Sequence, residues 1–391
     1  MIVASDMPLQ GAFATTARLN ARAVRFVIES HGFRAGDHTV GYQSCDDSTA
    51  QTGVHDPRRC AANAQAFSGA EKLVAVVGPY NSQCAQIEVP IANRAAGGPL
   101  AIVSPSTTSP NLTRGGELAL PPPFGFRGEP DVYYPTGERN LLRLAARGDL
   151  NGVALARLAR DLGLRSVYLL NDAPDGIGDV LYTDGFESAA PDMGVGVAGV
   201  EAAGDPAGYA KLAEHVAKSG ADGVLLGTFL DAALLKALRE RLGRRVVLLA
   251  GEGFLPPSAV LEAAGEAAEG LYVASPELSP GAVELSADGE RFVRGFGQGA
   301  HASFVLQSAQ ATEAVLTAIA RSDGTRASLL RELRTTEESD GLFGHFRFDR
   351  YGDITPARFT ILRVTADAPP GERVPGLENA VAERVIEVPT D

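Results

Sequence analysis

The first 110 residues alternate predicted strands with segments that are apolar on one side only. Strands are predicted at 2–5, 39–45, 73–77 and 100–103, and the last two are uninterrupted apolar runs typical of strands buried on both faces. Between the first two strands, Leu19, Ala23 and Phe26 recur at helical spacing on one face. This alternation of strands and helices predicts a parallel, doubly wound α/β sheet.

The same alternation returns in the second half of the chain. Strands are predicted at 166–170, 195–200, 223–226 and 246–250, and helices at 149–162, 209–218 and 232–242. Helices at 286–298 and 302–320 and a strand at 358–364 follow, and the Pro-rich tail after Ala366 is expected to pack loosely. Since 391 residues are too many for one ordinary domain, we expect two α/β lobes.

Three stretches interrupt the alternation. The runs at 141–145 and 271–274 predict strands from which the chain crosses between the lobes. Residues 115–138 are rich in Gly and Pro, which predicts a long irregular insertion. A loop of this length inside a compact protein is usually either functional or mobile.

Small hydroxyl residues gather where two neighbouring strands end. Ser82 stands at the start of a predicted helix after strand 73–77, whereas Ser106, Thr107 and Thr108 follow strand 100–103. Ligands of open α/β sheets bind at the carboxyl ends of the strands, and a helix N-terminus offers donors to a carboxylate. Ordinary caps and Ser/Thr turns are the alternative, but two such turns on adjacent strand ends favour a ligand site.

Glu252 complements these hydroxyl groups from the other half of the chain. It follows strand 246–250 between two glycines, in the sequence AGEGF. A carboxylate that faces the hydroxyl turns across a cleft would accept hydrogen bonds from an ammonium group. Donors on one lobe and an acceptor on the other would suit a zwitterionic amino acid.

Composition excludes several other functions. The chain has 35 basic and 48 acidic residues, and the net charge of −13 argues against a nucleic-acid partner and against an anionic membrane surface. The six histidines lack metal or triad spacing, Asp46-Asp47 is expected to be a solvated strand end, and the GxGxxG match at 194–199 opens a strand instead of a helix. We therefore expect no cofactor, no metal site and no catalytic residues.

The three cysteines leave two alternatives open. Cys45, Cys60 and Cys84 lie in the first quarter of the chain and show no CxxC spacing. One disulfide and a free thiol are expected in an exported protein, and three reduced thiols in a cytoplasmic one. Met1 leads directly into a predicted strand, which does not separate the two.

Several segments, taken in order, resemble one known family. The sequence is similar to the leucine/isoleucine/valine-binding family of type I periplasmic solute-binding proteins in SDMPLQG, VAVVGPYNSQCA, AIVSPSTTSPNLT, AGEGF and GHFRFDRYGDI. The resemblance implies two doubly wound lobes that are joined by three crossings and close on a ligand like a Venus flytrap. Lobe 1 would comprise 1–143 and 276–349, lobe 2 would comprise 144–275 and 350–391, and 115–138 would be an insertion.

The resemblance also assigns expected roles to individual residues. Ser82 would bind the ligand carboxylate, Ser106 and Thr108 would bind the carboxylate and the ammonium, and Glu252 would hold the ammonium. The remaining expected pocket residues are Tyr80, Phe229, Phe304 and Ile177, the last replacing a ring that family members commonly have. The expected disulfide joins Cys60 to Cys84 and leaves Cys45 free.

The family implies a function without catalysis. We expect a monomeric extracytoplasmic protein, its signal or anchor lying outside this sequence, that captures an amino acid or related small carboxylate for the permease of an ABC transporter. The alternative is the ligand-sensing domain of a larger signalling protein, for example one linked to a kinase. An α/β enzyme is a third hypothesis, for which the sequence offers no nucleophile, metal cluster or phosphate loop.

Overall fold

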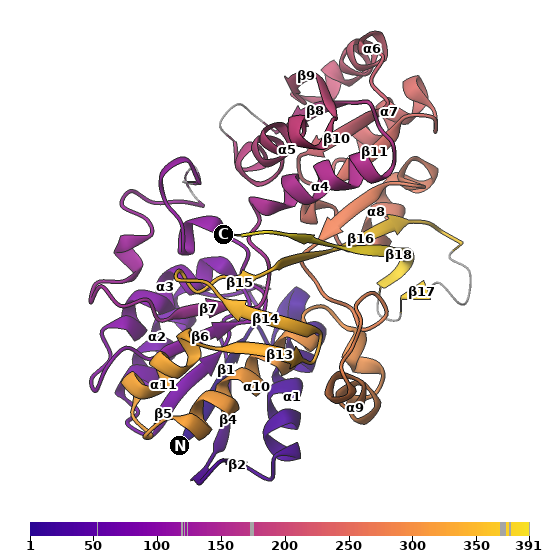
Figure 1. Ribbon diagram of the computed structural model, residues 1–391. Coiled ribbons are helices and arrows are strands. Elements are labelled where there is room, and N and C mark those ends of the chain that lie inside the picture. Colours follow the sequence, from indigo (N-terminus) through magenta and orange to yellow (C-terminus); the bar gives the residue numbers. More distant parts are fainter. Residues whose placement is uncertain are drawn as a thin grey trace.

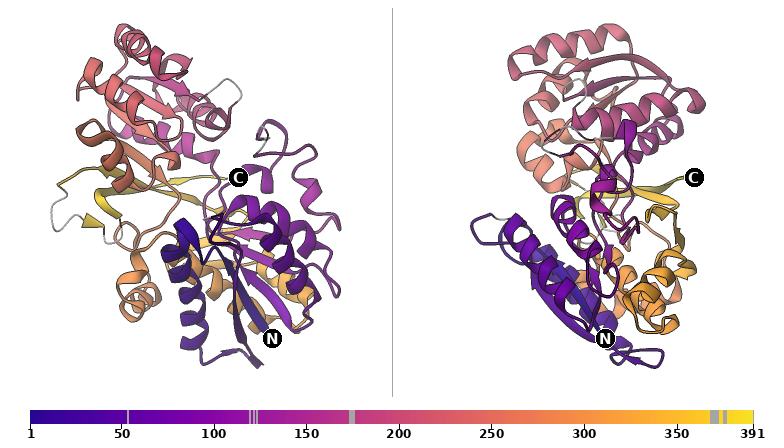
Figure 2. Two further views of the ribbon diagram at one scale, coloured as in Figure 1. Left: turned by 180° about the vertical axis from the view of Figure 1, so that it is seen from behind. Right: turned by 90° about the vertical axis from the view of Figure 1, so that its left-hand side faces the viewer.

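Two α/β bodies make up the molecule, and the chain passes between them more than once (Figure 1). The structure is a computed structural model that describes residues 1–391 except 53, 119, 121, 123, 173–175, 368–372, 375–376 and 391. We call the body with the five-stranded sheet the first lobe and the body with the eight-stranded sheet the second lobe. Seen from the side, the two lobes are stacked end to end (Figure 2).

The first lobe is built on a parallel sheet with the strand order β4-β1-β5-β6-β7. Its strands are β1 (Ile2–Met7), β4 (Gly41–Asp46), β5 (Leu73–Val77), β6 (Ala101–Ser104) and β7 (Leu141–Arg143). Its helices are α1 (Ala14–Ser30), α2 (Pro57–Gly69), α3 (Ser82–Asn93), α9 (Ala287–Phe296), α10 (Val305–Arg321) and α11 (Arg326–Arg334). Two small antiparallel sheets complete it: β2 (Arg34–Ala35) with β3 (His38–Thr39), and β13 (Glu337–Gly341) with β14 (Gly344–Phe348) and β15 (Ile354–Thr355).

The second lobe has the strand order β17-β18-β16-β12-β11-β10-β8-β9. Its strands are β8 (Ser166–Asn171), β9 (Gly196–Ala202), β10 (Gly223–Gly227), β11 (Val247–Ala250), β12 (Tyr272–Ser275), β16 (Ala357–Val364), β17 (Arg373–Val374) and β18 (Leu377–Val388). Its helices are α4 (Leu150–Asp161), α5 (Asp184–Ala189), α6 (Tyr209–Ser219), α7 (Ala232–Leu242) and α8 (Pro257–Ala264). The strands from β8 to β12 pair in parallel, whereas β16, β17 and β18 pair antiparallel.

Each main sheet has an apolar core on both faces, which is what uninterrupted apolar strands require. In β5, Val77 packs with α1 and α10, whereas Val76 packs with α2 and α3 on the opposite face. In β10, Leu225 faces α4 and α5, whereas Leu226 faces α6, α7 and α8. The predicted fold class of two doubly wound α/β lobes is therefore confirmed.

The C-terminal tail differs from the prediction. Residues 377–388 form β18, which runs antiparallel to β16, with Ala380, Val381, Ile386 and Val388 buried. The expectation of a loosely packed tail was wrong because it rested on the Pro and Gly residues that precede this segment. The strand signal is the content of β-branched residues, Val381, Val385, Ile386 and Val388.

Candidate ligand-binding site

A cavity of about 470 Å³ opens between the lobes, a volume within the usual range for a small-molecule site. Both lobes line it, so that a ligand held there would contact each of them. Its lining includes the following residues predicted from the sequence: Tyr80, Ser82, Ser106, Thr108, Ile177, Phe229, Glu252 and Phe304.

Thr107 is the exception among the predicted residues. Its side chain is completely buried and its hydroxyl has no partner among the described residues, so it points away from the cavity that Ser106 and Thr108 line. Thr107, which the sequence predicted to contact the ligand, therefore does not line the cavity.

The N-terminus of α3 presents unused hydrogen-bond donors to the cavity. The Asn81 side chain does not cap the helix, and its Nδ2 atom is buried without a partner in the described part of the chain. The helical bonding begins with Ala85 N and Asn81 O at 3.1 Å, so the preceding N–H groups of the first turn are left over. These free N–H groups suit an anion such as a carboxylate, whereas the enclosed Nδ2 atom of Asn81 is out of reach of a ligand in the cavity.

The Ser82 hydroxyl lines the cavity beside this helix N-terminus. The Oγ atom of Ser82 accepts hydrogen bonds from the N–H groups of Thr108 and Ser109, each at 3.3 Å. Because the oxygen already accepts two bonds, its own proton is available to donate to a ligand. Ser106 is different, since its hydroxyl donates to Tyr80 O at 2.8 Å and only its lone pairs remain. Ser106 therefore suits an ammonium better than a carboxylate.

A glycine makes the approach to this helix possible. Gly78, between β5 and α3, has a φ of 137°. A Cβ atom there would lie 2.5 Å from the backbone oxygen of Asp6 on the neighbouring strand. Both the dihedral angle and this close approach restrict the position to glycine.

Glu252 approaches from the second lobe. It begins the short 3-10 turn η8 (Glu252–Phe254), and its Oε1 accepts a hydrogen bond from the Thr108 hydroxyl at 3.0 Å. Burial raises the pKa of Glu252 to about 7, although the Thr108 hydroxyl lowers it in part. The preceding Gly251 is required because a Cβ atom there would lie 2.1 Å from the Tyr182 ring. A ligand cation would relieve the desolvation of this carboxylate.

A second carboxylate of the cavity, Glu277, was missed in the sequence. It follows β12 at the point where the chain crosses back to the first lobe, and it lines the cavity together with Glu252. The signal was available, since Glu277 follows the carboxyl end of a strand just as Glu252 does. Other lining residues that the sequence did not single out include Phe13, Gln86, Leu181 and Tyr182.

Aromatic rings close one side of the cavity. Tyr80 makes an edge-on contact with Phe304, with ring centroids 5.8 Å apart, and a tilted contact with Phe13 at 5.9 Å. Phe304, the residue just before α10, has a φ of 60°, a left-handed conformation that is uncommon for a bulky residue. Phe229 is about half exposed at the cavity, as expected of an apolar side chain that a ligand would cover.

The predicted insertion reaches across to the second lobe. Leu120 packs in one apolar cluster with Val180, Leu181 and Tyr182, and Phe124 lies against the same cluster. Gln86 and Asn111 hold Phe124 in place by donating to its backbone oxygen at 2.8 and 3.1 Å. The described part of the insertion thus forms a wall of the cavity.

Buried arginines anchor the hydroxyl turn to the crossings. Arg143, which is fully buried at the end of β7, donates to Asp353 Oδ1 at 2.7 Å and to Ser109 O at 2.7 Å. Arg147 on the first crossing lies 3.2 Å from Asp353 Oδ2 and pairs with both oxygens of Asp149. Burial alone would raise the pKa of Asp353, but Arg143, Arg147 and Arg114 hold it below its ordinary value. This network fixes the ligand-facing turn relative to the crossing segments.

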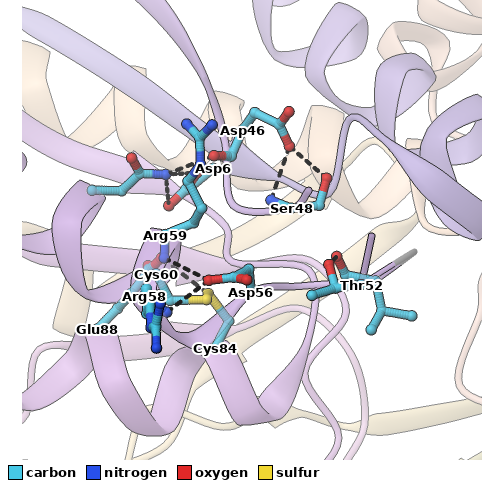
Figure 3. Close-up of a disulfide and its surroundings, with 12 residues drawn as sticks. Asp6, Asp46, Ser48, Thr52, Asp56, Arg58, Arg59, Cys60, Cys84 and Glu88 are labelled. Carbon is cyan, nitrogen blue, oxygen red and sulfur yellow. Dashed lines mark hydrogen bonds between the residues drawn. A yellow bond between two sulfur atoms is a disulfide. The ribbon is translucent and has the colours of Figure 1, made fainter. Parts of the chain in front are cut away.

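Cys60 and Cys84 form a disulfide that joins α2 to α3, the pairing that the resemblance implied, and Cys45 is free (Figure 3).

The expectation of a solvated strand end is wrong for Asp47, although it holds for Asp46. Asp46 is partly exposed and accepts bonds from Leu9 N and Ser48, but Asp47 is completely buried and neither of its oxygens has a partner among the described residues.

The buried Asp47 carboxyl makes stability depend on pH. Burial, together with the charges of Asp6 and Asp46, raises the pKa of Asp47 to about 8. Burial raises the pKa of Asp6 to about 6 and that of Glu88 well above its ordinary value. Because the folded state then binds protons that the unfolded state has released, the free energy of unfolding should fall as the pH rises from 5 to 8.

Replacing Asp47 by Asn should reverse part of this loss. We expect the variant to be more stable than the wild type at pH 8 by about 2 kcal/mol or more, and the gain to shrink at pH 5, where Asp47 is protonated. Chemical denaturation at both pH values measures the two differences. If the variant were no more stable than the wild type at pH 8, the assignment of a buried Asp47 carboxyl with a raised pKa would be contradicted.

Two α/β lobes with a lined cavity between them define a protein that binds a small molecule by enclosing it. The chain belongs to the periplasmic binding protein family, whose sequence model matches residues 6–369. This confirms, at the level of the family, the resemblance inferred from the sequence. No curated protein matches the sequence closely. None of the helices in the described part of the chain is long and apolar enough to cross a membrane.

Solved structures of similar fold carry different ligands. A leucine-binding protein of Thermotoga maritima has a TM-score of 0.68 at 20% identity, over 99% of this chain and 98% of that one. An ABC transporter substrate-binding protein of Desulfitobacterium hafniense in complex with Leu has a TM-score of 0.70 at 20% identity, over 99% of each chain. A solute-binding protein of an ABC transporter of R. palustris in complex with 4-hydroxybenzoate has a TM-score of 0.67 at 16% identity, over 99% of this chain and 96% of that one.

Proposed function

We propose that this protein captures an amino acid or a related small carboxylate between its lobes and delivers it to the permease of an ABC transporter. One observation supports this most strongly: the hydroxyl of Ser82 and the free N–H groups of the α3 N-terminus line the same cavity as the acceptor Glu252. A zwitterion would satisfy both groups, its carboxylate at the helix and its ammonium at Glu252.

We further propose that the lobes move as units. The predicted ranges are 1–143 with 276–349 and 144–275 with 350–391. The pairing of β15 with β14 supports a third crossing at about residue 356, somewhat later than predicted. Closure would be favoured only to the extent that the ligand contacts both lobes better in the closed state, and the Thr108 to Glu252 bond already spans them.

The disulfide supports a site of action outside the cytoplasm, where oxidised cysteines persist. Two of the similar solved structures are named as ABC transporter proteins, which favours transport over the signalling alternative. We propose that the protein acts as a monomer and leaves its ligand chemically unchanged.

A ligand screen by thermal unfolding tests the proposal. At 100 times its dissociation constant, a ligand that binds only the folded state adds about 2.7 kcal/mol, which should raise the midpoint by about 3 °C in a chain of this length. We expect this shift with at least one free amino acid or small carboxylate, benzoates included, and recovery of the compound unaltered. The absence of a midpoint shift with every compound tested, or chemical turnover of the ligand, would contradict the proposal.

A further inference from the structure

Two carboxylates face the cavity, and it supplies no cationic side chain to pair with them. Glu252 and Glu277 both line it, whereas the described lining residues include no Arg, Lys or His. Burial raises the pKa of each to about 7, and the charge of Glu252 adds to the shift of Glu277. One ammonium group can account for Glu252, which leaves the Glu277 carboxylate without a cationic partner among the described lining residues.

Glu277 is held in a fixed position. Its N–H donates to Ser275 Oγ at 3.1 Å, and its backbone oxygen accepts from the Thr360 hydroxyl at 2.7 Å. Hydrogen bonds thus fix both the N–H and the C=O group of the backbone that carries this carboxylate. Fixed placement of this kind is what a ligand-recognising side chain requires.

The surroundings of Glu277 differ from those of Glu252. Glu252 is linked through Thr108 to Ser82, so these three groups form the end that suits an amino acid head group. Glu277 instead interacts with Ser303, and its charge adds to the burial that raises the pKa of Tyr80. Tyr80 in turn contacts Phe304, the residue that follows Ser303. The second carboxylate therefore lies at the ring-lined side of the cavity.

Resting on the proposed function, we infer that the pocket selects an amino acid whose side chain carries a second cationic group, an amine or a guanidine, and that Glu277 binds this group beside the rings of Tyr80 and Phe304. The rings pack on the alkyl part of such a side chain and attract the cation at its end. An apolar side chain of the same length would leave the Glu277 carboxylate desolvated and unpaired.

Calorimetric titration at pH 8, with both carboxylates largely ionised, tests the inference on the whole chain. The ligands are L-lysine, L-ornithine and L-arginine, with L-norleucine as the analogue of lysine that lacks the side-chain amine. We expect at least one basic amino acid to bind roughly tenfold or more tightly than norleucine, as charged hydrogen bonds imply. Glu277→Gln should remove this preference by weakening the basic amino acid and tightening norleucine, because the neutral amide leaves no desolvated charge beside an apolar side chain. Glu266→Gln, an exposed control, should change neither affinity.

The outcomes separate the inference from the function on which it rests. Norleucine binding as tightly as all three basic amino acids would overturn the inference and leave amino acid capture intact. Equal weakening of lysine and norleucine in Glu277→Gln would also overturn it, because Glu277 would then act on every ligand alike. Binding of no amino acid at all would overturn both. Should the variant fail to fold, the comparison of ligands in the wild type alone decides.

Discussion

Replacing Asp353 by Ala should destabilise the protein by about 3–5 kcal/mol, because the change leaves buried guanidinium groups without their carboxylate. Arg143 is fully buried and donates to Asp353 at 2.7 Å, while Arg147 and Arg114 each lie 3.2 Å from it. A water molecule in the space of the lost carboxylate would carry no charge to compensate the buried guanidinium of Arg143. The loss should also weaken ligand binding, since Arg143 holds the Ser109 backbone in the ligand-facing turn.

Urea unfolding followed by circular dichroism measures this effect, since the chain has no Trp to report by fluorescence. Asp37→Ala is the matched control, because Asp37 is exposed and its replacement should change the free energy of unfolding by less than about 0.5 kcal/mol. A loss below about 1 kcal/mol for Asp353→Ala would show that the arginines find other partners and that the network does not anchor the turn.

Replacing Glu252 by Gln should have two effects of opposite sign. Affinity for an amino acid ligand should fall roughly tenfold or more, because a charged hydrogen bond to the ammonium is lost. Without ligand the variant should be more stable than the wild type at pH 8, because the carboxylate whose pKa burial raises to about 7 is gone. A purely structural role for Glu252 would not separate binding from stability in this way.

Titration calorimetry measures the first effect and thermal unfolding the second. Glu266→Gln makes the same chemical change at an exposed position and should leave both quantities unchanged. Unaltered affinity in Glu252→Gln would remove this residue from the ammonium site and would shift that role to Glu277.

The parts of the site that follow from local sequence were predictable. Ser82 begins the helix that follows the buried strand β5, and Glu252 follows the strand β11. The carboxyl ends of parallel strands meet at one edge of a sheet. The turn around Gly78 is set by residues that adjoin it in the chain. A sequence pattern alone therefore placed these side chains near one cavity.

The parts of the site that depend on tertiary packing could not be predicted from the sequence. Nothing local distinguishes Thr107 from Thr108, yet one is buried and the other lines the cavity. Asp47 resembles any solvated strand end until the packing around it removes water. Leu120 reaches the second lobe only because the insertion folds back over the cavity. The environment of such side chains depends on burial and on contacts between distant segments, and the neighbouring residues in the sequence determine neither.

The central claim is that one small zwitterion binds between the lobes, with its carboxylate at the α3 N-terminus and its ammonium at Glu252. Titration calorimetry of the wild type with the amino acid found in the screen, beside the same compound without its α-amino group, tests this most directly. We predict saturable one-to-one binding of the amino acid and at least roughly tenfold weaker binding of the deaminated compound. Equal affinity for the two compounds, or the absence of saturable binding by any amino acid, would contradict the account.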